Sequence, residues 1–421
     1  MRAFKHLGSR TKGDKVIWAV VVLLALVSLL AVYSSTGLLA YKMYKGNTEI
    51  YLFKQFAFIM AGVMIIYFAH MVNYIIYARV AKILFLISIP LLFYTLFFGV
   101  KLNEGSRWIR LPIINMTFQT SDLAKLALIM YISRLLSRKQ DQIKDLKKGF
   151  LPVILPVVVV CLLIAPANLS TALLIGATCM MLMFIGRVSG KHLLLTIGIA
   201  MIPVMVLVMA AVIRHKTIEP IPVKSKPESH SRLLVRVDTW INRVENFMYG
   251  SRRNLEDDNY QVNQAKIAVA NGGWIGLGPG NSRQRNFLPH PYSDFIYAII
   301  IEEYGLIGGA IIMFIYLVFL FRSIRIFKKC PFAFGAFLAL GLSFTLMIQA
   351  ISNMAVNVNL FPVTGVTLPL ISMGGSSFLF TCLAIGIILS VARNAEKTEG
   401  ESLDESETKE EYLESEETVI A

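Results

Sequence analysis

The residues from Gly272 to Gly309 join a glycine-rich, arginine-bearing loop to an aspartate and the start of an apolar helix. This aspartate, Asp294, lies at the point where the chain is expected to enter the membrane. A carboxylate at such a boundary is costly unless it is paired or used. One use is general-base catalysis, in which the carboxylate accepts the proton of an attacking hydroxyl group. Asp294 is therefore our first candidate for a catalytic residue.

A second group, Arg107, Trp108 and Arg110, lies between the third and fourth apolar segments. Arginine suits an anionic substrate because its planar group can pair with two oxygens of one phosphate. Tryptophan alone is more typical of an anchor at the level of the lipid headgroups. Beside two arginines, it could instead stack on a sugar ring. The cluster is a candidate site for an anionic, sugar-bearing substrate.

Asp122 and Lys125 follow in the next apolar segment, where Thr120 or Ser121 can cap the start of a helix. Their spacing of three residues places both charges on one helix face. A charged pair just inside a span should face protein or a watery cavity rather than lipid. Two interpretations stay open, a structural ion pair that orients the helix and a part of a substrate site.

Two later apolar segments also carry polar residues. Glu302 and Glu303 lie about 12 Å along a helix from Asp294 at a rise of 1.5 Å per residue, and we interpret them as buried structural carboxylates. Gln349 and Asn353 share one helix face because they are four residues apart. Such amides could bind between helices or line a substrate cavity.

The elements that must position these residues are membrane helices. The chain is 56% apolar and 11% aromatic, with a mean hydropathy of +0.62, which is far from the average of soluble proteins. We predict an all-α polytopic membrane protein with about ten transmembrane helices. The ten spans lie near residues 16–36, 50–70, 79–98, 119–137, 150–166, 168–187, 191–213, 294–321, 332–353 and 368–392.

Basic residues in short connections predict the orientation. The segments 1–15, 134–148 and 322–329 are strongly basic, and with ten spans all three fall on one side, which is the cytoplasm. Both termini are then cytoplasmic in a multi-pass protein of the cytoplasmic (inner) cell membrane. The first apolar segment is too long for a signal-peptide core, so we expect a retained span.

Three regions follow from this topology: a basic N-terminus at 1–15, a membrane domain at 16–393 and an acidic tail at 394–421. The tail has 11 of the 27 acidic residues and no apolar periodicity, which favours a disordered segment that either keeps the protein soluble or docks on a partner. The four cysteines have neither disulfide nor zinc-site spacing.

One large outer loop at 214–293, between spans seven and eight, is unexpectedly basic. It has 12 Lys and Arg against 7 Asp and Glu. Long loops cross the membrane largely regardless of charge, so the topology stands. The basic side chains could rest on anionic lipid headgroups. Alternatively, the loop recognises an anionic substrate.

Three motifs closely resemble those of the SEDS family, which includes FtsW, RodA and SpoVE. The first is GSRWIRLP running into QTSDLAK, and the second is YQVNQAKIAVANGGWIGLGPGNS followed by FLPHPYSDFIYAIIIEEYGLIG. The third is QAISNMAVNVNLFPVTGVTLPLISMGGSS. The resemblance covers the chain from the first span to about Arg393, and all three motifs occur in order at matching membrane positions.

The resemblance implies a peptidoglycan glycosyltransferase that polymerises lipid II on the outer face of the cytoplasmic membrane during cell division, more like FtsW than RodA. Asp294 matches the family's catalytic aspartate and would serve as general base, with undecaprenyl pyrophosphate as the leaving group. Because that group leaves as a stable anion, one base is enough. The residues expected to bind substrate are Arg107, Trp108, Arg110, Asp122, Lys125, Ser282, Gln349, Asn353, Ser376 and Ser377.

The sequence departs from the family pattern at two places. Asp122 replaces a glutamate and Thr120 replaces a proline, and LPHPYSD stands where LPEAHTD is usual. Arg107, Arg110 and Lys125 would hold the developing pyrophosphate charge, a role that a divalent cation such as Mg²⁺ or Mn²⁺ could share. Its protein ligands, if any, are unknown from the sequence.

The expected partners are lipid II, the growing lipid-linked glycan, a class B penicillin-binding transpeptidase and division-complex membrane proteins, with no nucleic acid. Two other functions fit the same sequence: a flippase that moves lipid II across the membrane, and the same polymerase acting in elongation. A flippase needs polar lining accessible from both sides. The polar cluster here is concentrated at the outer face, and no internal repeat is obvious, which favours the enzyme.

Overall fold

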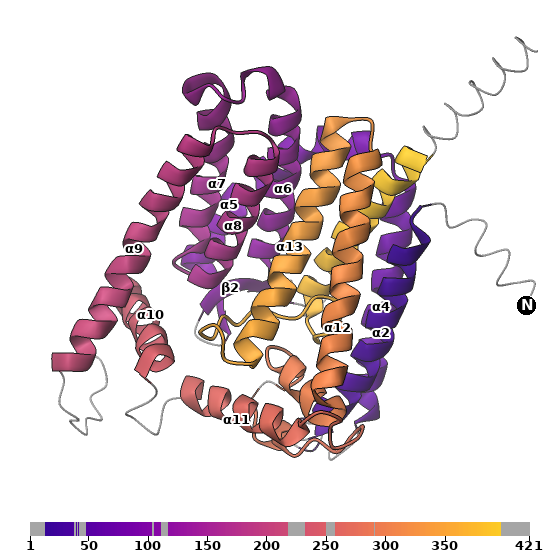
Figure 1. The fold of residues 1–421 in the computed structure, drawn as a ribbon, viewed down its shortest axis with the longest axis vertical. Helices are drawn as coiled ribbons and strands as arrows, with labels where there is room; N and C mark the ends of the chain where they lie inside the picture. The colour runs from indigo at the N-terminus through magenta and orange to yellow at the C-terminus, as the bar shows by residue number, and fades with distance from the viewer. Residues whose placement is uncertain are drawn as a thin grey trace, which may run out of the picture.

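The computed structural model describes residues 13–37, 39, 41, 48–102, 105–110, 117–217, 232–249, 257–289 and 291–396. In this part of the chain the fold is a bundle of membrane helices, which confirms the predicted class (Figure 1). Among the described residues, eight helices are long and apolar enough to cross a membrane, and α6 and α8 lie at the positions of the other two predicted spans. The α6 helix contains charged residues and α8 has only 17 residues.

The helices that correspond to the predicted spans are bounded as follows. They are α2 (Lys15–Ser35), α4 (Glu49–Met71), α5 (Tyr74–Phe98), α6 (Thr120–Arg138), α7 (Leu151–Ile164), α8 (Leu169–Ile185), α9 (Gly190–Thr217), α12 (Ile296–Lys329), α13 (Ala333–Asn357) and a C-terminal helix at Gly375–Glu396. A π-helical turn, Leu146–Phe150, leads into α7.

Several predicted boundaries differ from those of the helices, and α12 and α13 continue past the predicted ends at 321 and 353 to Lys329 and Asn357. The third span begins at Tyr74 rather than at 79, because Asn73 caps this helix by accepting a hydrogen bond from the N–H of Ile75 at 3.1 Å. The last helix begins at Gly375 rather than at 368. The residues before it form turns, in which Leu370 has a positive φ of 62°.

Short strands and additional helices lie outside the predicted spans. β1 (Val100–Leu102), β2 (Gly105–Arg110) and β3 (Thr117–Gln119) form a small antiparallel sheet in that order. In this sheet Trp108 is paired with Val100 on one side and Gln119 on the other. The predicted outer loop contains two helices, α10 (Arg232–Tyr249) and α11 (Asp257–Gly272), and a 3-10 turn at Gln284–Asn286.

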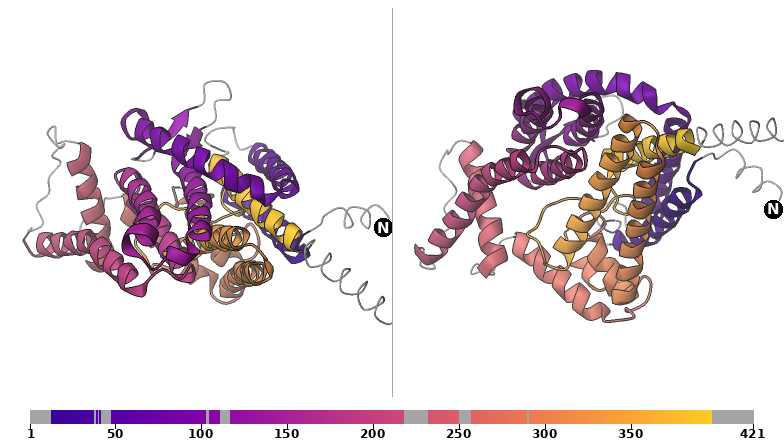
Figure 2. Two further views of the ribbon diagram at one scale, coloured as in Figure 1. Left: turned by 90° about the horizontal axis from the view of Figure 1, so that it is seen from above. Right: turned by 45° about the horizontal axis from the view of Figure 1, so that its top comes forward.

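The core of the bundle is formed around α13, which is the most buried of the long apolar helices, and the C-terminal helix. In contrast, α9 is almost entirely exposed and extends away from the bundle, with α10 packed against it (Figure 2). Exposed apolar residues are expected on lipid-facing helices. The α9–α10 pair therefore lies at the edge of the tightly packed centre.

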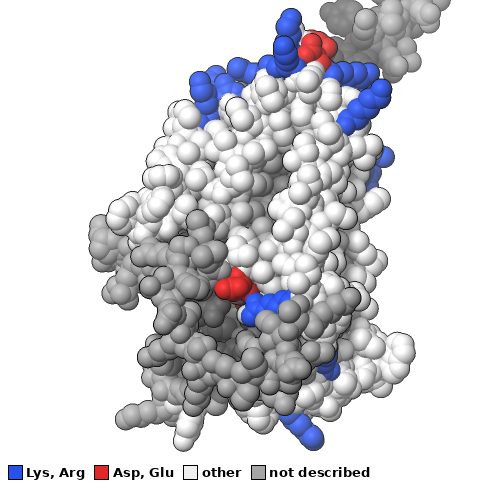
Figure 3. Space-filling view, turned by 90° about the vertical axis from the view of Figure 1, so that its left-hand side faces the viewer, with Lys and Arg blue, Asp and Glu red and all other residues white. Residues whose placement is uncertain are grey.

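Both described ends of the chain meet at one end of the bundle. The N–H of Gly13 donates to Glu396 Oε2 at 3.2 Å, and Asp14 pairs with Arg322 of α12 at 2.6 Å. Lysine and arginine side chains gather at this end (Figure 3). Asp294 lies just before the first residue of α12, whereas Arg322 is near the last residues of the same helix.

The loop after α11 forms backbone hydrogen bonds with α12 at a point where the helix is interrupted. Gly305 interrupts α12 with non-helical dihedral angles of φ 72° and ψ −177°. The N–H groups of Leu277 and Gly278 donate to the carbonyls of Glu302 and Glu303, both at 2.9 Å. The N–H of Leu306 donates in return to Gly273 at 2.9 Å. These bonds replace part of the helical ladder and fix the loop onto α12.

Candidate active site

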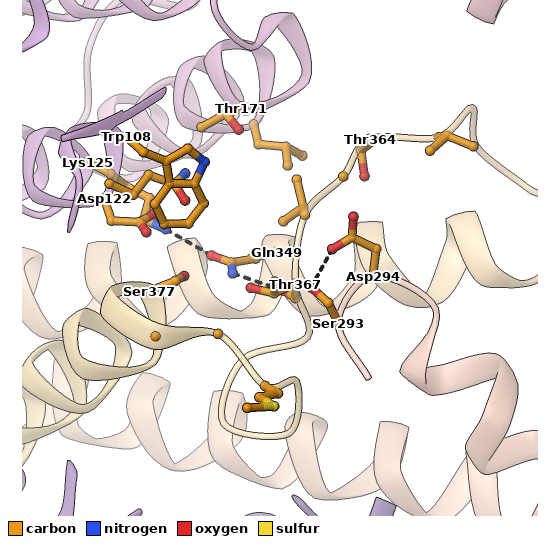
Figure 4. A pocket seen from close by; sticks show the side chains of 18 of the residues that line it. Trp108, Asp122, Lys125, Thr171, Ser293, Asp294, Gln349, Thr364, Thr367 and Ser377 are labelled. Carbon is orange, nitrogen blue, oxygen red and sulfur yellow. Dashed lines mark hydrogen bonds and ion pairs between the residues drawn. The ribbon is translucent and has the colours of Figure 1, made fainter. Parts of the chain in front are cut away.

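A cavity of about 690 Å³ lies between α6, α8 and α13 and extends to the connection between α13 and the C-terminal helix. Its polar lining includes Asp122, Lys125, Asp294 and Gln349, and Trp108 of β2 also lines it (Figure 4). Residues far apart in the sequence are thus brought to one space. A polar cavity within an apolar bundle is the expected setting for a substrate site.

Asp294 is half-buried at the cavity edge, two residues before α12. Its Oδ1 accepts a hydrogen bond from the hydroxyl of Ser293 at 2.8 Å. Its carbonyl oxygen accepts hydrogen bonds from the side-chain amides of Asn353 and Asn357, both at 2.9 Å. Asn357 Oδ1 also accepts from the N–H of Ala298 at 2.9 Å, in the first turn of α12. Two amides of α13 therefore set the position of Asp294.

Lys125 is paired on two sides inside the cavity. Its ammonium group lies 3.3 Å from Asp122 Oδ1 and donates to Gln349 Oε1 at 2.9 Å. Gln349 in turn donates to the carbonyl of Thr367 at 3.0 Å. Asp122 is only 4% exposed, and within the described residues its Oδ2 is buried without a hydrogen-bond partner. The pair is both an internal ion pair and part of the cavity wall.

The connection after α13 is tied to the segment that contains Asp294. Ser372 donates to the carbonyl of Ser293 at 2.6 Å, and the N–H of Met373 donates to the carbonyl of Tyr292 at 2.9 Å. Burial, and secondarily the negative charge of Asp294, raises the pKa of the Tyr292 phenol. Tyr292 thus stays protonated beside Asp294 at neutral pH.

A family model described as "Cell cycle protein", which is named for FtsW, RodA and SpoVE, matches residues 14–397. The chain belongs to this FtsW/RodA/SpoVE family. Stage V sporulation protein E of Bacillus subtilis (strain 168) is 33% identical over 389 residues, which cover 91% of this chain and 98% of that protein. "Probable peptidoglycan glycosyltransferase FtsW" of Trichlorobacter lovleyi is 32% identical over 387 residues, covering 90% and 93%.

Solved structures share the fold of this family member. One is a chain from work described as "Structural coordination of polymerization and crosslinking by a peptidoglycan synthase complex", with a TM-score of 0.67 and 22% identity over 91% of this chain and 98% of that one. Another is the rod shape determining protein RodA of Thermus thermophilus, with a TM-score of 0.62 and 20% identity over 91% and 97%.

Several residues that the family resemblance singled out do line the cavity. They are Trp108, Asp122, Lys125, Asp294, Gln349 and Ser377. The side chains of Arg107 and Arg110 lie outside the described residues, although the backbone of β2 places both positions next to Trp108. Their binding roles stay predictions.

Three other predicted binding residues do not line the cavity and instead make hydrogen bonds within the protein. Ser282 is buried, and its hydroxyl donates to Glu302. Ser376 accepts a hydrogen bond from the N–H of Gln119 at 3.1 Å, which joins the C-terminal helix to the small sheet. Asn353 holds the carbonyls of Asp294 and, at 2.8 Å, Val366. The sequence indicated that these polar residues have a role, but their hydrogen-bond partners are set by the tertiary structure.

Glu302 and Glu303 are buried structural carboxylates, as predicted. Glu302 accepts hydrogen bonds from Asn271 and from the backbone N–H groups of Arg283 and Gln284, at 3.2 to 3.4 Å. Glu303 accepts from the hydroxyl of Ser34 in α2. The two carboxylates thus fix the loop after α11 against α12 and α2.

From the sequence, the loop at 214–293 was a candidate for substrate recognition, but the residues of the loop that line the cavity were not identified. Arg243 of α10 and Gln261 of α11 both line it. A signal was present, because apolar residues recur every three or four positions in 232–249. Such a pattern is typical of an amphipathic helix at a membrane surface. Thr171 and Thr178 of α8 add hydroxyl groups to the lining of the same cavity.

Proposed function

We propose that this chain is a peptidoglycan glycosyltransferase that polymerises lipid II on the outer face of the cytoplasmic membrane, with Asp294 as general base. The observation that carries the proposal is that Asp294 and Lys125 line one cavity and are both bound to α13. A base and a cation so placed can act on the attacking and leaving groups of a single transfer. Membership of the FtsW/RodA/SpoVE family and the FtsW relatives support the same activity.

In the proposed reaction Asp294 accepts the proton of the 4-hydroxyl group on the acceptor's N-acetylglucosamine. The oxygen attacks C1 of the donor's muramyl sugar, and a new C–O bond forms as the bond from C1 to the pyrophosphate oxygen breaks. The configuration at C1 inverts in this single displacement. The pyrophosphate leaves with the electron pair and needs no proton, which explains why one carboxylate suffices.

Lys125 is placed to stabilise the charge that develops on the pyrophosphate. Because Asp122 and Gln349 already hold its ammonium group, little reorganisation is needed when the substrate arrives. Trp108 on the same wall can cover a sugar ring. Arg107 and Arg110 would add positive charge beside it.

A divalent cation fits this site mainly as a ligand of the substrate. Within the described residues, no group of three His, Cys, Asp or Glu side chains is close enough together to hold a metal. Mg²⁺ often binds through one or two carboxylates together with substrate phosphates. Asp122, whose Oδ2 is buried without a described partner, is the carboxylate that could hold it. A bound cation would neutralise pyrophosphate charge.

We place this activity in cell division, with both termini in the cytoplasm and a class B penicillin-binding transpeptidase as partner. The FtsW relatives favour division. The lysine- and arginine-rich end that contains both described chain ends favours the orientation. One structurally similar chain comes from a peptidoglycan synthase complex, which favours the partner. Depletion in growing cells separates the two roles, since loss of septa supports division and loss of rod shape supports elongation.

The decisive experiment is glycan-strand synthesis from purified lipid II by the wild type and Asp294→Asn, each co-purified with its transpeptidase, with and without Mg²⁺ or Mn²⁺. We expect polymer from the wild type only. Asp141→Asn, which changes an exposed carboxylate between α6 and α7, is the matched control and should retain activity. Equal polymer from wild type and Asp294→Asn would exclude Asp294 as the base.

A further inference from the structure

Two cationic side chains line the cavity among the described residues, and they come from different parts of the fold. Lys125 belongs to α6, within the packed bundle, and Arg243 belongs to α10, which packs against the outlying α9. In Figure 1 these two helices lie at different heights and on different sides of the strand β2. The cavity therefore has two separate points at which it can hold an anion.

Lys125 is bound to the same helix, α13, that positions the proposed base. Gln349, which binds its ammonium group at 2.9 Å, is one helical turn from Asn353, which binds the carbonyl of Asp294 at 2.9 Å. Four residues of helix rise by about 6 Å. The side chains of α13 that bind Lys125 and the backbone of Asp294 are thus one helical turn apart.

Arg243 is held by the pairing of α10 with the end of α9. Arg214 of α9 lies 3.7 Å from Asp238 and 3.9 Å from Glu245. His215 lies 3.4 Å from Glu245, and its ring stacks on Tyr249 at a centroid distance of 3.9 Å. These contacts fix the rotation of α10 about its axis, and with that rotation Arg243 lines the cavity. An amphipathic helix at the membrane surface keeps its arginines at headgroup level.

The proposed reaction requires two anion sites at different distances from Asp294. Both lipid-linked substrates carry a pyrophosphate. In the donor it is attached directly to the reacting carbon, whereas in the acceptor it is two sugar rings away from the attacking hydroxyl group. Because Lys125 and the backbone of Asp294 are bound to the same helix, we assign Lys125 to the near position, and the other cation of the described lining, Arg243 of α10, to the far one.

We propose that Arg243 binds the pyrophosphate of the acceptor lipid, so that α10 forms a wall of the acceptor site, while Lys125 faces the donor. This inference rests on the proposed glycosyltransferase function. Arginine suits the task because its group can pair with two phosphate oxygens at once. After each transfer the only pyrophosphate left on the product is the former acceptor's. Arg243 would then hold the product until its pyrophosphate moves to the donor position at Lys125 for the next transfer.

The first test measures binding with the chemistry switched off. Asp294→Asn protein in lipid nanodiscs is titrated with the lipid-linked disaccharide pyrophosphate that lacks the stem peptide. We expect two molecules bound per protein, and one when Arg243→Ala is added. Arg236→Ala, two turns earlier on α10 and outside the cavity lining, should leave both sites intact. Unchanged stoichiometry and affinity in the Arg243 variant would overturn the proposal, whatever the activity of the wild type.

The second test measures turnover with two lipid II analogues, one of which can act only as donor and the other only as acceptor. A lipid II analogue with its 4-hydroxyl group inverted serves only as donor, and one with a phosphonate at C1 serves only as acceptor. Arg243→Ala should raise KM for the acceptor analogue by about tenfold or more and leave KM for the donor analogue unchanged. Arg243→Lys should recover part of the loss. Both variants should make shorter strands from ordinary lipid II than the wild type does, and the strands of Arg243→Ala should be the shortest.

The ligand of Arg243 is distinguished by comparing acceptors with and without the stem peptide, which also carries carboxylates. If Arg243→Ala raises KM equally for both acceptors, the pyrophosphate is the ligand. A defect confined to the peptide-bearing acceptor would assign Arg243 to a peptide carboxylate and overturn the proposal. A wild type that binds two disaccharide lipids but makes no product would refute the proposed function and leave the two-site assignment standing.

Discussion

Asn353 in α13 donates a hydrogen bond of 2.9 Å to the backbone carbonyl of Asp294, the proposed catalytic base. Asn357, one turn later, donates to the same carbonyl and caps the first turn of α12. The base is therefore placed by a neighbouring helix that also holds Lys125 through Gln349. A single rigid helix thus sets the distance between the two groups on which the proposed chemistry depends.

Asn357→Ala tests whether this backbone anchoring matters for rate. The change removes the bond to Asp294 and leaves the N–H of Ala298 without its partner. We expect kcat to fall by about 10- to 100-fold, because small displacements of a catalytic group have effects of this size, with little change in KM. Ser352→Ala, which removes a buried hydroxyl without a described partner on the same helix, is the control. A matching loss in both variants would indicate general damage to α13.

Lys125→Met separates the structural and substrate roles of the ion pair. The variant should lose activity, and it should also be less stable by roughly 3 kcal/mol because Asp122 is left as a buried, unpaired carboxylate. The thermal midpoint in detergent gives the stability, and strand synthesis gives the activity.

The double variant Asp122→Asn/Lys125→Met removes both charges. It should recover most of the lost stability without recovering activity, since the cation that faces the pyrophosphate is still missing. Recovery of both properties together would mean that the pair is purely structural.

Gly276→Ala should disrupt the attachment of the loop to α12. Gly276 has a φ of +87°, and an added Cβ would lie 2.2 Å from the carbonyl oxygen of Glu303. Gly280 has a similar φ of +77° but nothing within 4 Å of the added atom. Gly280→Ala should therefore cost only about 1 kcal/mol of backbone strain. The Gly276 variant should lower the thermal midpoint much more, and equal shifts would argue against the close packing.

Tyr292 should contribute a measurable dependence of stability on alkaline pH. Burial, and next the charge of Asp294, raises its pKa in the folded protein above the usual value of about 10. The folded state then binds a proton that the unfolded state releases. Stability from this group is full below about pH 10 and is lost as the pH rises through the raised pKa. The fall should be steeper in the wild type than in Tyr292→Phe, and parallel curves would contradict the assignment.

The membrane helices were predictable because each is encoded in its own window of apolar residues. Hydropathy found α9 as readily as α13, although one is exposed to lipid and the other is buried. The small sheet was not predictable in this way, because β1 and β3 have only three residues each. Their pairing depends on contacts between segments that are separate in the sequence.

The candidate site could be predicted only in part, for a related reason. Asp122 and Lys125 were predicted to lie together because residues three apart in a helix are neighbours on the same face. Ser282 was assigned to the substrate from its motif, yet its hydroxyl is bonded to Glu302, which follows twenty residues later. Arg243 lies in a segment with a clear amphipathic pattern, but the pattern does not reveal which side chain reaches the cavity.

The interruption of α12 at Gly305 has a consequence for biogenesis. A helix that enters lipid with unsatisfied backbone groups is costly, and those near Gly305 are satisfied by the loop at residues 273–278 rather than by α12 itself. During synthesis α11 and this loop emerge from the ribosome before α12. The backbone groups that α12 needs are therefore synthesised before α12 itself, and in the proposed topology they reach the outer face first. The order of the chain thus matches the order in which this part of the membrane domain can be assembled.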